Sequence, residues 1–232
     1  MTETLHASAP PAPAAPAAEP RYAFVLYDSR SGSTLFAALL NRYRGVSVSL
    51  ESAFVSRVVE YGGPLRSAAD LEALADYLFA EVQFAELGLA RPEVVAALRG
   101  AGPPYGKREL ARALLELYFG RRDPEALVRV VKNPPFFYVG LLEEWLPGVR
   151  FVHVVRDGRA VYNSKRSSRS ISGAVMQPNL VKAARDWRRA VRIAERHPAS
   201  VLTVRYEDLV RDPDAVMARV LDHLGVPPEG RA

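Results

Sequence analysis

Residues 28–34, Asp-Ser-Arg-Ser-Gly-Ser-Thr, have the composition of a loop that binds phosphate or sulfate. An apolar run of strand length precedes them and a helical pattern follows them. Small residues at such a junction let backbone N–H groups and the N-terminus of the helix point at an anion, and an arginine adds positive charge. The candidate residues are Arg30, Ser31, Gly32, Ser33 and Thr34. The alternative is an ordinary turn between a strand and a helix, with Ser33 as the helix cap.

A second candidate anion site follows a later apolar run, residues 150–155. Arg156 comes directly after this run, and Ser164 follows eight residues later, about two helical turns on. The guanidinium can pair with a phosphate, and the hydroxyl can donate a hydrogen bond to the same group. Asp157 has the position of a helix N-cap. A surface arginine and a helical serine are the alternative interpretation of this pair.

Neither segment matches a Walker nucleotide-binding motif. The first has no upstream glycine and no Gly-Lys-Ser/Thr, so it holds no Walker lysine. A Walker B strand would end in a carboxylate for Mg²⁺, and Arg156 stands at that place. A small-molecule kinase of P-loop-like fold needs both features, so it is the weaker alternative for the function.

Five apolar runs of strand length, separated by helical patterns, are the elements that must position these residues. They are residues 22–27, 46–50, 127–132, 150–155 and 201–205. This alternation predicts an α/β fold: a P-loop-like parallel sheet of about four to five strands with helices on both faces. In such sheets the ligand lies at the carboxyl ends of the strands. We therefore expect the chemistry to come from the residues that follow the strands, which include residues 29–34, Glu51, Lys132, Asn133, Arg156 and Asp157.

Together the two loops resemble the donor site of the sulfotransferases that use 3′-phosphoadenosine 5′-phosphosulfate (PAPS). In that family an Arg/Lys-Ser-Gly-Ser/Thr-Ser/Thr loop after the first strand holds the 5′-phosphosulfate, and residues 30–34 match it. An Arg-Asp…Ser element with the same eight-residue gap holds the 3′-phosphate, and Arg156 with Ser164 match it. A third match, residues 204–213, adds Tyr206 to the implied donor site. The resemblance spans residues 21–228 and implies the sulfotransferase fold, with PAPS as co-substrate.

Within the family, the motif layout is most similar to that of tyrosylprotein sulfotransferases and their bacterial relatives. In these enzymes a glutamate 21 residues after the loop arginine is the general base, and here that residue is Glu51. A lysine opens a Lys-Asp/Asn-Pro element after the next central strand, and here it is Lys132. The resemblance implies in-line displacement at sulfur without a metal: Glu51 accepts the proton of the acceptor hydroxyl, and Arg30 and Lys132 stabilise the charge on the transferring group. Without the family, Glu51 is a first-turn residue that interacts with a helix dipole, and Lys132 is a solvated cation.

The sequence departs from the family pattern at three places. Ser29 replaces the usual proline before the loop arginine, and the sequence stops at Ala232, where many members continue into a basic loop that clamps the 3′-phosphate. The tyrosylprotein enzymes are membrane-anchored in the Golgi, whereas no run here approaches the roughly 18 apolar residues of a membrane span. We therefore expect a cytoplasmic protein without a membrane span.

The charge of the chain is unevenly distributed. The formal net charge is +5, but residues 150–211 contain 14 basic and 5 acidic residues. This excess favours an anionic partner, which includes nucleotides, sulfate or phosphate esters and nucleic acid. A solvated, arginine-rich surface is the alternative. A non-catalytic phosphate- or RNA-binding module would account for the basic segment, but it would not account for Glu51 and Lys132 at strand ends.

Residues 180–196 predict a strongly amphipathic helix inside this basic segment. Its apolar stripe comprises Leu180, Ala184, Trp187, Val191 and Ala194. The opposite face carries Lys182, Arg185, Arg189, Arg192 and Arg196. Basic stretches that bind RNA usually interleave aromatic residues for stacking, and this face has none. We therefore expect a solvated face and no nucleic-acid partner.

The remaining expectations concern domain organisation and the acceptor. Residues 1–20 hold five prolines and seven alanines without apolar periodicity, so we expect a disordered tail and one domain over residues 21–232. Residues 53–120 predict a helical insert on the acceptor side. The chain has no cysteine, which excludes a disulfide scaffold and a thiol nucleophile. The sequence leaves open whether the acceptor hydroxyl belongs to a peptide tyrosine, a sugar or a small molecule, and it leaves open the oligomeric state.

Overall fold

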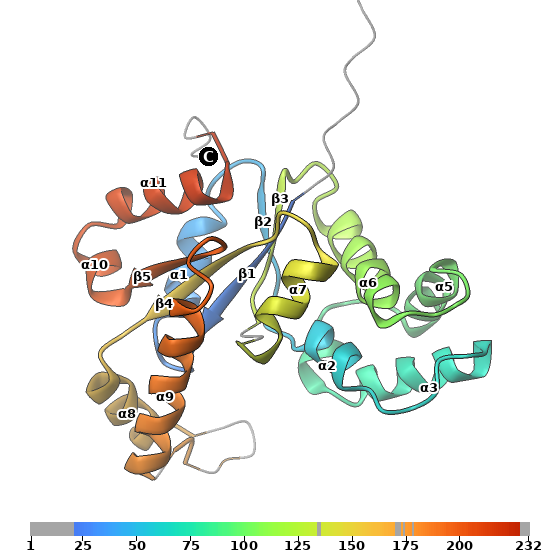
Figure 1. The fold of residues 1–232 in the computed structure, drawn as a ribbon, viewed down its shortest axis with the longest axis horizontal. Helices are drawn as coiled ribbons and strands as arrows, with labels where there is room; N and C mark the ends of the chain where they lie inside the picture. Colours follow the sequence, from blue (N-terminus) through green and yellow to red (C-terminus); the bar gives the residue numbers. More distant parts are fainter. Residues whose placement is uncertain (1–20, 134–135, 170–172, 174, 178, 228–232) are drawn as a thin grey trace, which may run out of the picture.

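The computed structural model describes residues 21–133, 136–169, 173, 175–177 and 179–227. At its centre lies a parallel sheet of five strands in the order β2-β3-β1-β4-β5 (Figure 1). The strands are β1 (Arg21–Tyr27), β2 (Val46–Val48), β3 (Val128–Val131), β4 (Arg150–Val155) and β5 (Val201–Arg205). The expected α/β fold and the five strands are therefore confirmed.

Strand β1 lies in the middle of the sheet and separates two hydrophobic cores. Tyr22, Phe24 and Leu26 point into one core, and the intervening Ala23, Val25 and Tyr27 point into the other. This alternation follows from the two-residue period of a strand. Because both faces are covered, β1 is apolar along almost its whole length, as expected for a central parallel strand.

Strand β2 is shorter than the sequence pattern predicts, because side chains replace the main-chain ladder at its end. Ser49 Oγ accepts a hydrogen bond from the Lys132 N–H at 2.9 Å, at a place where a strand carbonyl would otherwise accept it. The Leu50 N–H then donates to the Tyr118 hydroxyl at 3.1 Å. The chain therefore leaves the sheet at this point and carries Glu51 out of the core.

Helices cover both faces of the sheet (Figure 1). On the face of Val25 lie α1 (Ser33–Leu40), α10 (Tyr206–Arg211) and α11 (Pro213–Leu224). On the face of Phe24 lies α7 (Val139–Trp145), which follows the short 3₁₀ helix η1 (Phe136–Tyr138). Two further helices, α8 (Gly158–Ser167) and α9 (Leu180–Glu195), connect β4 to β5.

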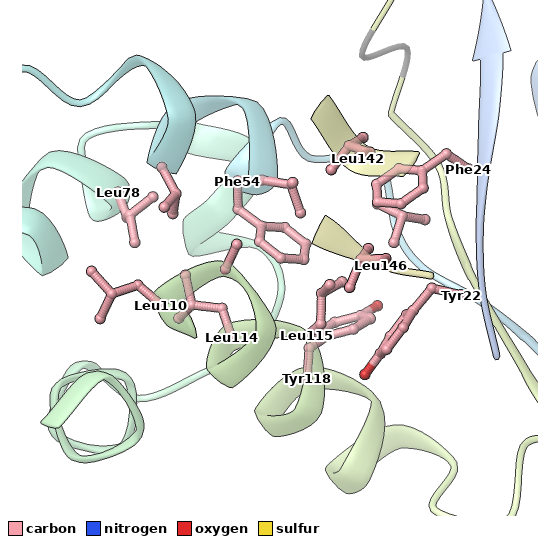
Figure 2. Packing of buried hydrophobic residues seen from close by; sticks show 14 of the residues in the cluster. Tyr22, Phe24, Phe54, Leu78, Leu110, Leu114, Leu115, Tyr118, Leu142 and Leu146 are labelled. Carbon is pink, nitrogen blue, oxygen red and sulfur yellow. The ribbon is translucent and has the colours of Figure 1, made fainter. Parts of the chain in front are cut away.

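The chain between β2 and β3 forms five helices that share the core on the Phe24 face. They are α2 (Phe54–Glu60), α3 (Ala68–Phe79), α4 (Val82–Ala85), α5 (Arg91–Gly100) and α6 (Lys107–Arg122). Figure 2 shows Phe54, Leu114 and Tyr118 pointing into the same core as Tyr22 and Phe24 of β1. These helices are thereby fixed to the sheet beside the carboxyl end of β2.

Helix α9 lies in a different rotation from the one that its apolar stripe predicts. The buried side chains are Ala183, Ala190 and Ala194, whereas Leu180 and Ala184 are exposed. These small side chains face the rest of the protein, and they allow the helix to pack closely there.

Across the described part of the chain, no helix combines the length and the apolar character that crossing a membrane requires.

Candidate active site

The loop between β1 and α1 has a backbone shape suited to an anion. Among the described residues, Arg30 is the single non-glycine residue with positive φ, at 72°. Gly32, at φ 92°, is the N-cap of α1, so the alternative expectation that Ser33 caps the helix is wrong. No described side chain caps the first N–H groups of this helix, which leaves them free for an anion. A Cβ on Gly32 would overlap the ring of Tyr206, so this position requires glycine.

The structure brings the two predicted anion-binding segments together. Arg30 Nε donates a hydrogen bond to Ser164 Oγ at 3.0 Å, and Arg156 Nη1 donates to the Arg30 carbonyl at 3.2 Å. The Arg156 guanidinium also lies 4.5 Å from the centre of the Tyr206 ring. These contacts surround a cavity of about 200 Å³. Its lining consists of Arg30, Gly32, Ser33, Thr34, Leu35, Arg156, Ser164 and Tyr206.

Ser31 belongs to the same loop but does not line this cavity. Its side chain is buried, and its hydroxyl has no hydrogen-bond partner within the described part of the chain. A buried hydroxyl without a hydrogen-bond partner lowers the stability of a folded protein. The hydroxyl is therefore an available donor inside the loop that the sequence assigns to an anion.

Lys132 joins the ends of β2 and β3 to the loop after β1. Its Nζ lies 2.8 Å from Glu51 Oε2 and 3.3 Å from Thr34 Oγ1. The Lys132 side chain is 11% exposed, whereas the Glu51 side chain is 44% exposed. A nearly buried cation thus holds a solvent-accessible carboxylate next to the proposed donor loop.

The Arg156 main chain is fixed from two sides. Its carbonyl accepts a hydrogen bond from Trp187 Nε1 of α9 at 2.9 Å, and the next N–H, that of Asp157, donates to Glu207 Oε1 of α10 at 3.0 Å. Asp157 caps α8 as predicted, because its carboxylate accepts the Arg159 N–H at 2.8 Å. Hydrogen bonds from Arg159 hold the pKa of Asp157 well below its usual range. Asp157 is therefore a structural cap.

The structure adds Tyr27, which the sequence places only in a strand. Its hydroxyl is buried and has no hydrogen-bond partner among the described residues, and Lys132 Nζ lies 6.0 Å from its ring centre. Burial raises the pKa of the Tyr27 hydroxyl, and the nearby charge of Glu51 raises it further. The hydroxyl thus keeps its proton and is a donor beside Glu51 and Lys132. The available signal was a tyrosine as the last strand residue before the loop.

The structure also adds an ion pair between the loop after β1 and helix α8. Lys165 Nζ donates to Asp28 Oδ1, and the two side chains are 8% and 17% exposed. Lys165 directly follows Ser164, and Asp28 lies two residues before Arg30. The pair therefore ties together the two elements that carry the predicted anion-binding side chains. In the sequence, a lysine within a helix gave no signal of burial.

Comparisons with known proteins agree with this geometry. The sequence profile described as "Sulfotransferase family" matches residues 23–230. Over 139 residues the chain is 31% identical to the omega-hydroxy-beta-dihydromenaquinone-9 sulfotransferases Stf3 of Mycobacterium bovis and Mycobacterium tuberculosis. These alignments cover 52% of this chain and 33% of each relative, so the matched part spans about a third of the length of those relatives.

Solved structures show the same architecture. The sulfotransferase domain of the Synechococcus PCC 7002 olefin synthase superposes with a TM-score of 0.57 at 25% identity, over 89% of this chain and 74% of that one. The sulfotransferase domain of the curacin biosynthetic pathway gives a TM-score of 0.56 at 18% identity, over 90% and 75% of the two chains. The narrower likeness to tyrosylprotein sulfotransferases stays a prediction. With the profile matched over nearly all described residues and the fold shared, the chain belongs to the sulfotransferase family.

Proposed function

We propose that the protein transfers a sulfuryl group from PAPS to an acceptor hydroxyl, with Glu51 as the general base. The observation that carries this proposal is the connection from Glu51 through Lys132 to Thr34, at distances of 2.8 and 3.3 Å. The Lys132 ammonium contacts both the Glu51 carboxylate and Thr34 of the loop that we propose binds the donor. Proton removal, charge stabilisation and donor binding then occur at neighbouring atoms.

The side chains and N–H groups around the loop after β1 suit the anionic groups of PAPS. Within the described part of the chain, the first N–H groups of α1 and the Ser31 hydroxyl have no partner, and together with the Arg30 side chain they suit the 5′-phosphosulfate. Arg156 and Ser164 suit the 3′-phosphate, and the Tyr206 ring beside Arg156 suits the neighbouring part of the nucleotide. When bound, PAPS would supply the sulfuryl group, and adenosine 3′,5′-bisphosphate would be the leaving group.

The protein's own residues perform the remaining steps. Glu51 accepts the proton of the acceptor hydroxyl, a contribution of roughly 10²–10⁴ in rate. Lys132 and Arg30 stabilise the negative charge that develops on the leaving phosphate oxygen. The Tyr27 hydroxyl, which keeps its proton, offers a hydrogen bond beside the same carboxylate. Its burial holds this donor in place before the reaction begins.

We further propose that the acceptor hydroxyl belongs to a molecule with an apolar body. Leu50 precedes Glu51 and Leu35 follows Thr34, and both leucines are exposed. An exposed leucine is thus the next residue in the chain beside Glu51 and beside Thr34, although Leu35 also lines the proposed donor cavity. The name of the related Stf3 enzymes indicates that those proteins act on a hydroxylated menaquinone derivative. A hydroxyl on an apolar small molecule is therefore favoured here over a sugar or a peptide tyrosine.

An acceptor screen with PAPS labelled at sulfur tests the proposal. We expect label transfer to long-chain or prenylated alcohols and little transfer to sugars or tyrosine peptides. Lys132→Ala should abolish the transfer, whereas Lys182→Ala, on an exposed ion pair of α9, should not. Parallel reactions with labelled ATP and Mg²⁺ test the kinase alternative. Phosphate transfer from ATP, or no sulfuryl transfer to any acceptor class, would contradict the proposal.

A further inference from the structure

Helix α9 carries a row of arginines on the side opposite its buried residues. The row comprises Arg185, Arg188, Arg189, Arg192 and Arg196, and all five side chains are exposed. None of these guanidinium groups forms an ion pair or a hydrogen bond with any residue that the structure describes. Of the two acidic residues on the helix, Asp186 is already paired with Lys182 at 2.6 Å, and Glu195 forms no ion pair with any residue that the structure describes.

The spacing of this row makes the arginines repel one another. Arg185 and Arg189, and likewise Arg192 and Arg196, are four residues apart and therefore adjacent on the helix surface. Like charges at this spacing destabilise a helix. An anionic partner would remove that repulsion, whereas solvent alone only screens it. The sequence-based interpretation as a solvated face leaves this uncompensated charge without a role.

Large apolar side chains lie exposed beside the arginine row. Phe137, Leu180 and Val181 are 64%, 57% and 66% exposed. Phe137 and Val181 line an open groove of about 780 Å³ together with the arginines, and the Arg189 guanidinium lies 4.1 Å from the centre of the Phe137 ring. Leu180 lines a second groove of about 910 Å³ on the other flank of the helix, with Trp187 and Val191.

Helix α9 projects far enough from the rest of the protein to contact a broad surface. The first turns of α9 and the adjoining α8 extend beyond the edge of the sheet (Figure 1). A helix that combines aliphatic side chains with a row of arginines is typical of a helix lying in a lipid–water interface. Single-stranded nucleic acid would require free aromatic rings for stacking, and one face of the exposed Phe137 ring is already occupied by the Arg189 guanidinium.

We propose that α9, with Phe137 beside it, docks the protein on an anionic lipid surface. The arginines lie near the lipid phosphates, while Leu180 and Val181 enter the boundary of the acyl chains. Each basic side chain near such a surface contributes about a fivefold gain in partitioning. The attraction falls with salt because the charges are screened beyond about 10 Å at 0.1 M. The argument for docking does not rest on the proposed sulfuryl transfer, although the groove beside Leu180 also includes Arg156 of the candidate donor site.

Vesicle flotation with the full chain tests the proposal. We expect binding to phosphatidylcholine vesicles that contain about a third phosphatidylglycerol, and no binding to pure phosphatidylcholine. Arg185→Glu with Arg192→Glu should lower partitioning more than tenfold. The matched control, Arg42→Glu with Arg44→Glu, makes the same change in charge at exposed positions before β2 and should have little effect. Leu180→Ser with Val181→Ser should also weaken binding, and this loss should persist at low salt.

Three results would overturn the proposal. Equal losses in the two charge-reversal variants would mean that only net charge attracts the vesicles. Equal binding to neutral and anionic vesicles would remove the role of the arginines. Binding of a soluble polyanion such as RNA, tighter than that of vesicles and abolished by the same two substitutions, would make the row a polyanion site. If the double reversal fails to fold, Arg192→Gln alone, with an expected loss of about fivefold, decides the same question.

Discussion

Replacing Lys165 by methionine tests how the donor loop is tied to α8. The Lys165 and Asp28 side chains are 8% and 17% exposed, and Asp28 Oδ2 has no hydrogen-bond partner among the described residues. Removing the lysine therefore leaves a largely buried carboxylate without its counter-charge, which costs about 3–5 kcal/mol of unfolding free energy. The affinity for adenosine 3′,5′-bisphosphate should fall as well, because Ser164 and Arg30 lose their fixed separation.

The chain offers a matched control for this substitution. Lys182 forms an ion pair with Asp186 four residues on, but the side chains are 63% and 42% exposed, so Lys182→Met should cost under about 0.5 kcal/mol. Urea unfolding followed by circular dichroism measures both variants. Combining Lys165→Met with Asp28→Leu should recover most of the stability, because no buried charge remains unpaired. A Lys165→Met variant within about 1 kcal/mol of Lys182→Met would refute this reasoning.

Three further results are expected. Arg156→Ala should weaken binding of adenosine 3′,5′-bisphosphate by about 1.5–3 kcal/mol and that of 5′-AMP much less in titration calorimetry; equal losses would make the residue structural. Gly32→Ala should abolish bisphosphate binding through overlap with Tyr206, whereas Gly88→Ala, also at positive φ but facing open space, should retain it in the same assay. Burial lowers the pKa of His153 to about 4, so the unfolded chain takes up a proton first as pH falls below about 6.5. Stability should fall by about 2 kcal/mol between pH 7 and pH 5 in urea titrations, and His153→Leu should remove most of that slope.

Much of the fold and of the candidate site follows from local patterns in the sequence. The five strands are short, apolar and bounded by turns, so each is visible without tertiary information. The carboxyl edge of a parallel sheet then collects whatever follows the strands. That rule alone is enough to group Arg30, Glu51, Lys132 and Arg156.

The features that the sequence missed depend on contacts between distant segments. Asp28 and Lys165 are 137 residues apart, and nothing local indicates that this lysine is buried. The rotation of α9 is set by close packing of Ala190 and Ala194 against the protein, which outweighs the larger apolar stripe. The Tyr27 hydroxyl has no hydrogen-bond partner among the described residues, and its neighbours Glu51 and Lys132 come from distant segments. Periodicity identifies these elements, but it does not fix their rotation or pairing.

Steady-state turnover of Glu51→Gln, measured beside its affinity for adenosine 3′,5′-bisphosphate, tests the central claim most directly. Glutamine keeps the size of the side chain and still accepts a hydrogen bond from Lys132, but it does not accept a proton at neutral pH. We predict that kcat falls by roughly 10²–10⁴ while the dissociation constant of the bisphosphate stays unchanged and the protein stays folded. Near-normal kcat on an acceptor that the wild-type protein sulfates would contradict the assignment of Glu51 as the general base.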